Sequence, residues 1–162
     1  MIKAISFGLV YGFVKLFSLL PFWFLNGVGR VIFILLDNVI HYREKIIIRN
    51  LENAFPGKSA QEIKKIKSRF YRYFSRLLVE NIKMFNFPLT KLEKYIYLEN
   101  PELIKDYYER GISVSAIAAH YGNWEWLLGL KRDIPHHSIG IFKSLNNQYF
   151  NNFFTRHRSA YG

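Results

Sequence analysis

The chain has 162 residues, enough for one domain of ordinary size, and contains no cysteine, which excludes a disulfide framework, a cysteine nucleophile and a thiolate metal site. Its net charge of +11 favours anionic partners such as phospholipid headgroups, acidic carrier proteins or nucleic acid. Aromatic residues make up 18% of the chain, a share more typical of a protein at a membrane interface than of a soluble domain.

Two apolar stretches open the chain. Residues 2–20 and 21–39 are predicted to form two helices that meet at Pro21, with Lys15 as a further interruption. No small-residue cleavage site follows a basic segment, so a cleaved signal peptide is not expected. We expect residues 1–40 to anchor the protein in a membrane, either by spanning it or by dipping into one leaflet as a hairpin. The alternative is a pair of core helices in a soluble protein.

Most of the excess positive charge follows this apolar segment. Residues 41–76 contain ten basic residues and only three acidic ones, Glu44, Glu52 and Glu62. This placement fits a surface that touches anionic lipid. It also fits the positive-inside rule, by which basic residues next to a membrane segment lie on the cytoplasmic side. The alternative is a solvated helix face.

A long amphipathic helix is predicted from Ser59 to about Phe87. Ser59 and Glu62 have the spacing of a capping box, and apolar residues then recur at three- and four-residue steps until Pro88 ends the pattern. The apolar face is predicted to be core. A separate basic stripe runs along the same helix: Lys65, Arg69, Arg72 and Arg76.

Helices and strands are predicted to alternate in the rest of the chain. Helices are expected over 102–109, 124–131 and 146–158, and strands over 95–98, 112–118 and 137–143. This order predicts an α/β fold, in which membrane-associated helices and a helical region lead into a partial, mostly parallel sheet flanked by helices. A parallel sheet is normally covered on both faces, and two or three strands are too few to form such a sheet. We therefore expect the chain to be a fragment of a longer protein.

The turn after the predicted strand 112–118 carries the chemistry. His120 and Glu125 lie five positions apart, with Gly122 and Asn123 between them. A histidine is the commonest general base, a carboxylate can orient its ring, and backbone amides around Gly122 and Asn123 can stabilise an oxyanion. By spacing alone, a hydrogen-bonded structural histidine is the alternative. A serine hydrolase is not expected without a Gly-x-Ser-x-Gly elbow, nor a metal site without further ligands.

Several co-linear blocks carry a family resemblance: YREK (42–45), RNLENAFPGKS (49–59), FY (70–71), ENIK (80–83), SAIAAHYGNWEW (115–126) and RHRSAYG (156–162). Together they resemble the bacterial lipid A biosynthesis (late) acyltransferases, the lauroyl/myristoyl transferases of the lysophospholipid acyltransferase superfamily. The resemblance implies that 41–162 is the N-terminal part of an acyltransferase catalytic domain. It also implies that His120 is the catalytic base with Glu125 as its partner, and that Arg158, or else Arg156, holds the phosphate or acyl-donor side.

The resemblance implies transfer of a fatty acyl group from an acyl carrier protein or coenzyme A thioester to a hydroxyl or amine of a membrane lipid, such as a lipid A precursor. Gly122, Asn123, Arg156 and Arg158 are then expected to bind substrate, with no metal or organic cofactor. The implied location is the cytoplasmic face of the inner membrane. The alternative function is a non-catalytic, truncated membrane-binding protein with a basic helical surface. Nucleic acid is not an expected partner, because the apolar N-terminus would have no role in binding it.

Overall fold

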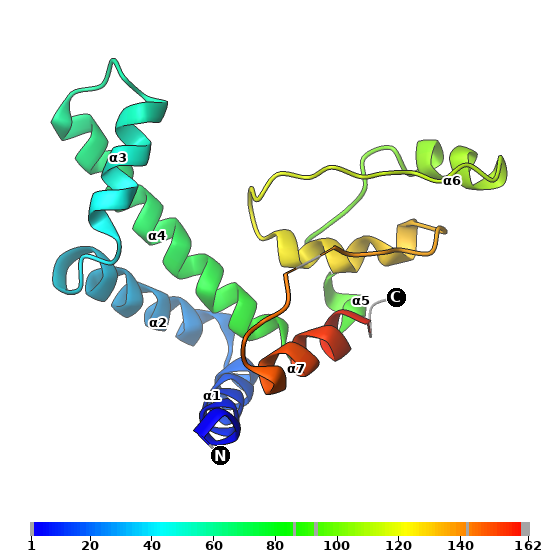
Figure 1. Cartoon of the computed structure of the whole chain (residues 1–162), viewed down its shortest axis with the longest axis horizontal. Coiled ribbons are helices and arrows are strands. Elements are labelled where there is room, and N and C mark those ends of the chain that lie inside the picture. The colour runs from blue at the N-terminus through cyan, green and yellow to red at the C-terminus, as the bar shows by residue number, and fades with distance from the viewer. Residues whose placement is uncertain (1, 86, 93, 142, 160–162) are drawn as a thin grey trace. The chain divides into compact units, whose positions relative to one another are not determined.

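The computed structural model describes residues 2–85, 87–92, 94–141 and 143–159 (Figure 1). Packing divides the chain into two compact units, one of residues 17–83 and one of residues 84–162 together with residues 1–16. The elements in chain order are α1 (Ile2–Leu19), α2 (Phe22–Ile34), the π-helix η1 (Leu35–Val39), α3 (Glu44–Ala54), α4 (Ala60–Met84), α5 (Leu89–Leu92), α6 (Pro101–Glu109), the 3₁₀-helix η2 (Trp124–Asp133) and α7 (Gln148–Ser159).

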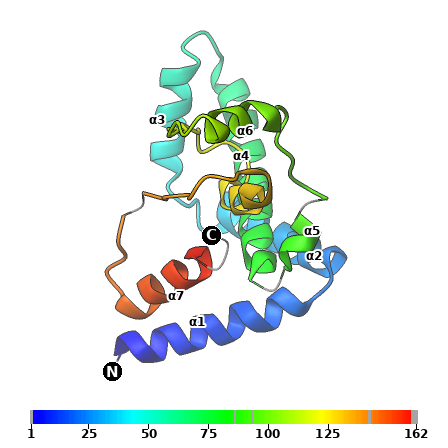
Figure 2. The ribbon, with the colours of Figure 1, turned by 90° about the vertical axis from the view of Figure 1, so that its right-hand side faces the viewer.

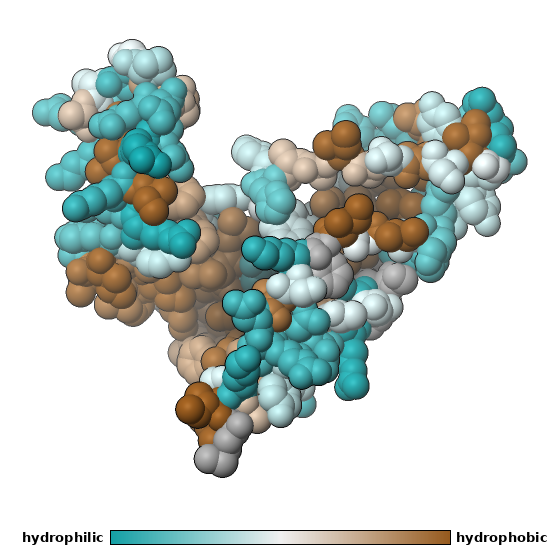
Figure 3. Space-filling model, in the orientation of Figure 1, coloured by the Kyte–Doolittle hydropathy of each residue, from teal (hydrophilic) through white to brown (hydrophobic). Residues whose placement is uncertain are grey.

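The predicted N-terminal helices are confirmed as α1 and α2. Pro21 precedes α2 with φ −67° and ψ 154°, an extended conformation that separates the two helices. Both Ile2–Leu19 and Phe22–Val39 are long and apolar enough to cross a membrane, and only 6% and 17% of their residues are buried. Apolar side chains accordingly gather over α2, whereas polar ones cover α3 (Figure 3). Such exposure agrees with membrane association.

Helix α4 organises the 17–83 unit. Its buried positions recur every four residues: Ile63, Lys67, Tyr71, Ser75 and Val79. Helix α2 approaches this face at Gly29, where an added Cβ would lie 3.3 Å from Val79 Cγ2. At the far end of α4, Lys83 Nζ donates to the carbonyl oxygens of Ser18 (2.9 Å) and Leu20 (2.8 Å). Its positive charge therefore caps the C-terminal end of α1.

The predicted capping box of α4 is confirmed. Ser59 N and Oγ each donate to Glu62 Oε2 at 2.9 Å, and Glu62 N donates to Ser59 Oγ at 3.3 Å. Hydrogen bonds from the Ser59 backbone and side chain, with a further one from Lys58, lower the pKa of Glu62 to about 2.

A buried polar cluster joins α4 to the segment after α2. The Lys67 ammonium forms ion pairs with Asp37 (3.2 Å) and with Glu44. Burial opposes its charge, but the hydrogen bonds to Glu44 and Asp37 and the negative charges of both carboxylates together raise the pKa of Lys67. The same hydrogen bond from Lys67 lowers the pKa of Glu44. Asp37 lies in the π-helix, and His41 and Arg43 have positive φ of 51° and 53°, so the cluster sits in a strained stretch of backbone.

Aromatic rings hold α7 in the 84–162 unit. The Phe153 ring lies 6.1 Å from the Phe7 ring of α1 and 5.2 Å from the Phe85 ring, between their centroids. Both views show α7 alongside the N-terminal part of α1 (Figures 1 and 2). Helix η2 packs on α5, where a Cβ on Gly129 would lie 3.3 Å from Leu92 Cβ.

The predicted α/β fold with a partial parallel sheet is wrong, because the described residues form helices and irregular segments with no β-strand. Residues 112–118 are extended, but every one of them is exposed, and Ile117 is 97% exposed. A strand is stable only when its amides and carbonyls pair with a neighbouring strand. The predicted strands 95–98, 112–118 and 137–143 have no such ladder among the described residues, which leave out residue 142. The predicted helix 124–131 is a 3₁₀-helix rather than an α-helix.

Candidate active site

The turn that carries His120 lies between an extended segment and η2. Helix α6 ends at Glu109, and Gly111, with φ of +67°, then reverses the chain into the irregular residues 112–119. A second left-handed glycine, Gly122 with φ +71°, then turns the chain into η2. An L-residue avoids this region because its Cβ crowds the backbone, so glycine suits the position. Asn123 precedes η2, and its carbonyl accepts a hydrogen bond from Trp126 N at 3.0 Å.

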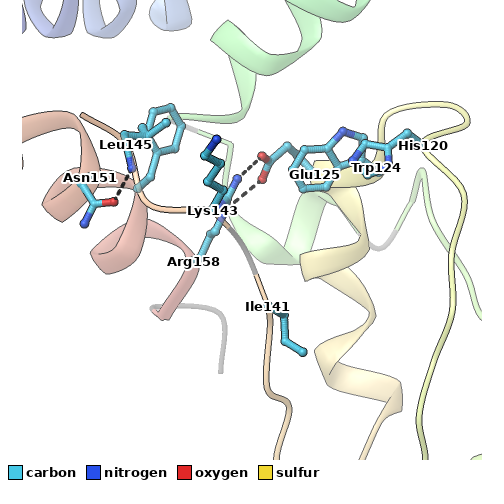
Figure 4. A pocket seen from close by; sticks show the side chains of 9 residues that line it. His120, Trp124, Glu125, Ile141, Lys143, Leu145, Asn151 and Arg158 are labelled. Carbon is cyan, nitrogen blue, oxygen red and sulfur yellow. Dashed lines mark hydrogen bonds and ion pairs between the residues drawn. The ribbon is translucent and has the colours of Figure 1, made fainter. Parts of the chain in front are cut away.

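A hollow of about 590 Å³ opens beside this turn, between η2, the residues 141 and 143–145, and α7 (Figure 4). We call it the His120 hollow. Its lining residues are His120, Trp124, Glu125, Ile141, Lys143, Leu145, Asn151, Phe154 and Arg158. The site therefore combines one histidine, one carboxylate and two cations with an apolar wall.

His120 is exposed, and its ring contacts Trp124, with 5.2 Å between the ring centroids and a tilt of 58°. The indole holds the imidazole at the mouth of the hollow without using either ring nitrogen. Among the described residues neither ring nitrogen forms a hydrogen bond, so both remain open to a bound molecule. A histidine placed this way can take a proton from an acceptor group that enters the hollow.

Glu125 is paired with Arg158. Arg158 donates from Nη2 to Glu125 Oε1 at 2.5 Å and from Nε to Oε2 at 3.4 Å, and both side chains are about four-fifths buried. Figure 4 shows the carboxylate oxygens turned toward Arg158. The guanidinium also lies over the Trp124 ring, 5.5 Å from its centroid. Among the described side chains, no hydrogen bond joins Glu125 to His120. The predicted histidine–carboxylate contact is thus replaced here by a carboxylate–arginine contact.

The other predicted substrate-binding residues are placed unevenly. Arg158 lines the His120 hollow, whereas Arg156 is exposed and does not line it. Gly122 and Asn123 flank the hollow through the turn and do not contribute to its lining. Of the two arginines considered from the sequence, the geometry favours Arg158.

Sequence reasoning missed two polar residues of the hollow. Lys143 lies on the segment between η2 and α7, and no described carboxylate forms an ion pair with it. Asn151 accepts a hydrogen bond from Leu145 N through its Oδ1 at 2.9 Å, which holds this segment against α7. Neither residue belongs to a motif, so the sequence carried no local signal for them.

A second histidine, His157 of α7, lies near Glu125 but is packed among aromatic rings. The His157 ring stacks on Phe153 and Phe85, with centroid distances of 6.0 and 5.5 Å. Burial lowers the pKa of His157. Burial thus disfavours the charged form of His157, and its ring contacts are those of a packed side chain. Among the residues that the structure describes, no group of three or more His, Asp or Glu side chains could hold a metal ion.

The whole chain, residues 1–162, matches the family model described as bacterial lipid A biosynthesis acyltransferase. The chain therefore belongs to this family, as its sequence blocks predicted. Searches of curated proteins and of solved structures found no significant match. Membership implies an acyltransferase of lipid A biosynthesis, with an acyl donor and a lipid acceptor in general terms. Members of this family are typically membrane-associated, and the two apolar helices agree with that.

Proposed function

We propose that this protein transfers a fatty acyl group from an acyl carrier protein or coenzyme A thioester to a hydroxyl or amine of a membrane lipid, such as a lipid A precursor. The observation that carries the proposal is an exposed histidine at the mouth of a hollow that also holds Glu125, Arg158 and Lys143. A base beside paired and unpaired cations suits a reaction between two phosphate-bearing substrates.

In this mechanism His120 accepts the proton of the acceptor hydroxyl through an imidazole nitrogen. The oxygen attacks the thioester carbonyl carbon and forms a tetrahedral oxyanion, which the amides of Gly122 and Asn123 stabilise. The C–S bond then breaks, the new ester forms, and the imidazolium returns its proton to the leaving thiolate. No covalent intermediate with the enzyme is needed.

Glu125 has two positions in this scheme. With the hollow empty, it is held by Arg158. A substrate phosphate competes for the Arg158 guanidinium, because the fork of an arginine binds phosphate and carboxylate with the same geometry. Glu125 is then free to turn toward His120, where it orients the ring and stabilises the imidazolium. Lys143 supplies a second charge for the phosphate of the donor or acceptor.

The same proposal assigns residues 1–40 to membrane anchoring and residues 41–162 to the catalytic part, as the N-terminal portion of a larger catalytic domain. The exposed apolar surfaces of α1 and α2 support anchoring. The ten basic residues of 41–76 support contact with an anionic membrane surface, and their charge favours the cytoplasmic face of the inner membrane.

A second candidate is a membrane-binding protein without turnover. The pairing of Glu125 with Arg158 favours it, because no carboxylate of the described residues then pairs with His120. Such a protein would use the same apolar helices and basic surface but would move no acyl group.

The test is transfer of a radiolabelled acyl chain from acyl carrier protein, and in parallel from coenzyme A, to a lipid A precursor in mixed micelles. His120→Ala is expected to lower the rate about a hundredfold or more, the range of general-base catalysis. The matched control is His137→Ala, which removes an exposed histidine outside the hollow and should leave the rate unchanged. Equal rates for both variants would remove His120 from the mechanism. Membrane binding without any transfer by the unmodified chain would favour the second candidate.

A further inference from the structure

A second hollow lies in the 17–83 unit, beside the contact between α2 and α4. Its volume is about 560 Å³, and we call it the arginine hollow. The lining residues are Asn26, Gly29, Arg30, Phe33, Ile34, Arg72 and Arg76. No carboxylate lines it, and the described part of the chain contains no ion pair to any of its three arginines.

The sequence brings these arginines together through two helical stripes. On α2, Asn26, Arg30, Phe33 and Ile34 follow one another at steps of three and four residues, so they share one face. On α4, Arg72 and Arg76 lie one turn apart, each next to a buried residue of the same helix, Tyr71 and Ser75. Gly29 lets the helices approach closely, since a Cβ there would meet Val79. The contact therefore places Arg30 opposite the two arginines of α4.

The positive charge of the arginine hollow favours binding of an anion. Three guanidinium groups around one cavity repel each other unless a negative group lies between them. Arg72 is further oriented by the Phe33 ring, with its Cζ 5.2 Å from the ring centroid. Arginine forks bind phosphate oxygens with paired hydrogen bonds, and Asn26 adds an amide that can bind a hydroxyl.

The surroundings indicate that the phosphate belongs to a lipid. Arg30 is the one charged residue of α2, a helix apolar enough to enter a membrane. A charge in such a helix is costly in hydrocarbon and usually marks a functional site with a partner. Phe33 and Ile34 form an apolar border of the hollow, and the neighbouring Val31 is 56% exposed. We propose that the arginine hollow binds the phosphate of an anionic phospholipid headgroup, which places the Arg30 turn of α2 at the depth of the lipid phosphates.

The experiment compares partition of the full chain between vesicles of phosphatidylcholine alone and vesicles that also contain phosphatidylglycerol. The test variant is the double substitution Arg72→Lys and Arg76→Lys, which keeps every charge but removes the guanidinium forks. It is expected to lower the preference for phosphatidylglycerol vesicles by about tenfold or more, the effect of losing charge-assisted hydrogen bonds. The matched control, Arg69→Lys, alters an exposed arginine of α4 outside the hollow and should leave the preference unchanged.

Three results would overturn the proposal. The first is an unchanged preference in the double variant, which would show that only the surface charge matters. The second is an equal loss in Arg69→Lys. The third is complete competition by inorganic phosphate at the same phosphate concentration, which would assign the hollow to a free anion. If the double variant fails to fold, as judged by circular dichroism, Arg30→Lys on α2 provides the same comparison and is expected to show the same loss.

Discussion

Lys67 gives the sharpest test of how the 17–83 unit is held together. Its ammonium is 6% exposed and pairs with Asp37, which is 9% exposed, and with Glu44. Replacing it in Lys67→Met leaves the buried Asp37 carboxylate without a cation. Removal of one partner of a buried pair costs about 3 kcal/mol of unfolding free energy. We therefore expect a loss of about that size.

The measurement is urea unfolding in neutral detergent micelles at pH 7, followed by circular dichroism. The control, Lys65→Met, makes the same replacement at an exposed site of α4 and should change the free energy of unfolding by less than about 0.5 kcal/mol. The double variant Lys67→Met, Asp37→Asn should lose less than Lys67→Met alone, because no buried carboxylate is left unpaired. Equal unfolding midpoints for Lys67→Met and Lys65→Met would refute the reasoning.

The cluster also has a defined pH window. The pKa of Glu44 is lowered, so its contribution is present above the ordinary pKa of a glutamate, 4.5, and is lost as the pH falls through the lowered value. The pKa of Lys67 is raised, so its contribution is present below 10.5 and is lost as the pH rises through the raised value. The difference in unfolding free energy between the unmodified chain and Lys67→Met should therefore be largest between these limits.

Three further substitutions probe other parts of the chain by thermal unfolding. Ser59→Ala removes the cap of α4 and should cost about 1 kcal/mol of unfolding free energy at pH 7. Because the pKa of Glu62 is about 2, this loss should shrink as the pH falls from 4.5 toward 2. A loss independent of pH would contradict the capping box. Gly122→Ala forces a Cβ into the left-handed region at φ +71° and should cost about 1–2 kcal/mol, whereas Gly140→Ala, in open space, should not. Phe153→Ala removes a ring that contacts α1 and should cost about 2 kcal/mol; an unchanged melting temperature would show that the ring cluster does not hold α7.

The helices were predictable because their signals are local. The capping box Ser59–Glu62 and the four-residue spacing of apolar positions placed α4 to within a few residues. Pro21 correctly separated α1 from α2. Helix α3 lies outside the predicted helices although Ile46, Ile47 and Leu51 have helical spacing, because its short apolar pattern is interrupted by charged residues. The π-helix around Asp37 has no local signal in the sequence, and the ion pair of Asp37 with Lys67 joins residues 30 positions apart.

The strands and the details of the site depended on non-local contacts. The β-branched run at 112–118 has strand propensity, but propensity does not supply a hydrogen-bonding neighbour. At the site, spacing placed His120 and Glu125 at the same turn, and the family resemblance pointed to Arg158. That Glu125 pairs with Arg158 could not be read from spacing, because 33 positions separate them along the chain. The contact between Glu125 and Arg158 requires α7 to lie beside η2, and the aromatic rings of α7 pack that helix in the 84–162 unit.

The most direct test of His120 as the base is chemical rescue of His120→Ala by free imidazole in the acyl-transfer assay. The His120 hollow opens at an exposed position, so a small base can enter where the side chain is removed. We predict that imidazole restores part of the transfer rate in His120→Ala, in proportion to its neutral form, and has no such effect on Glu125→Gln. Full transfer by His120→Ala without imidazole would contradict the assignment of the base.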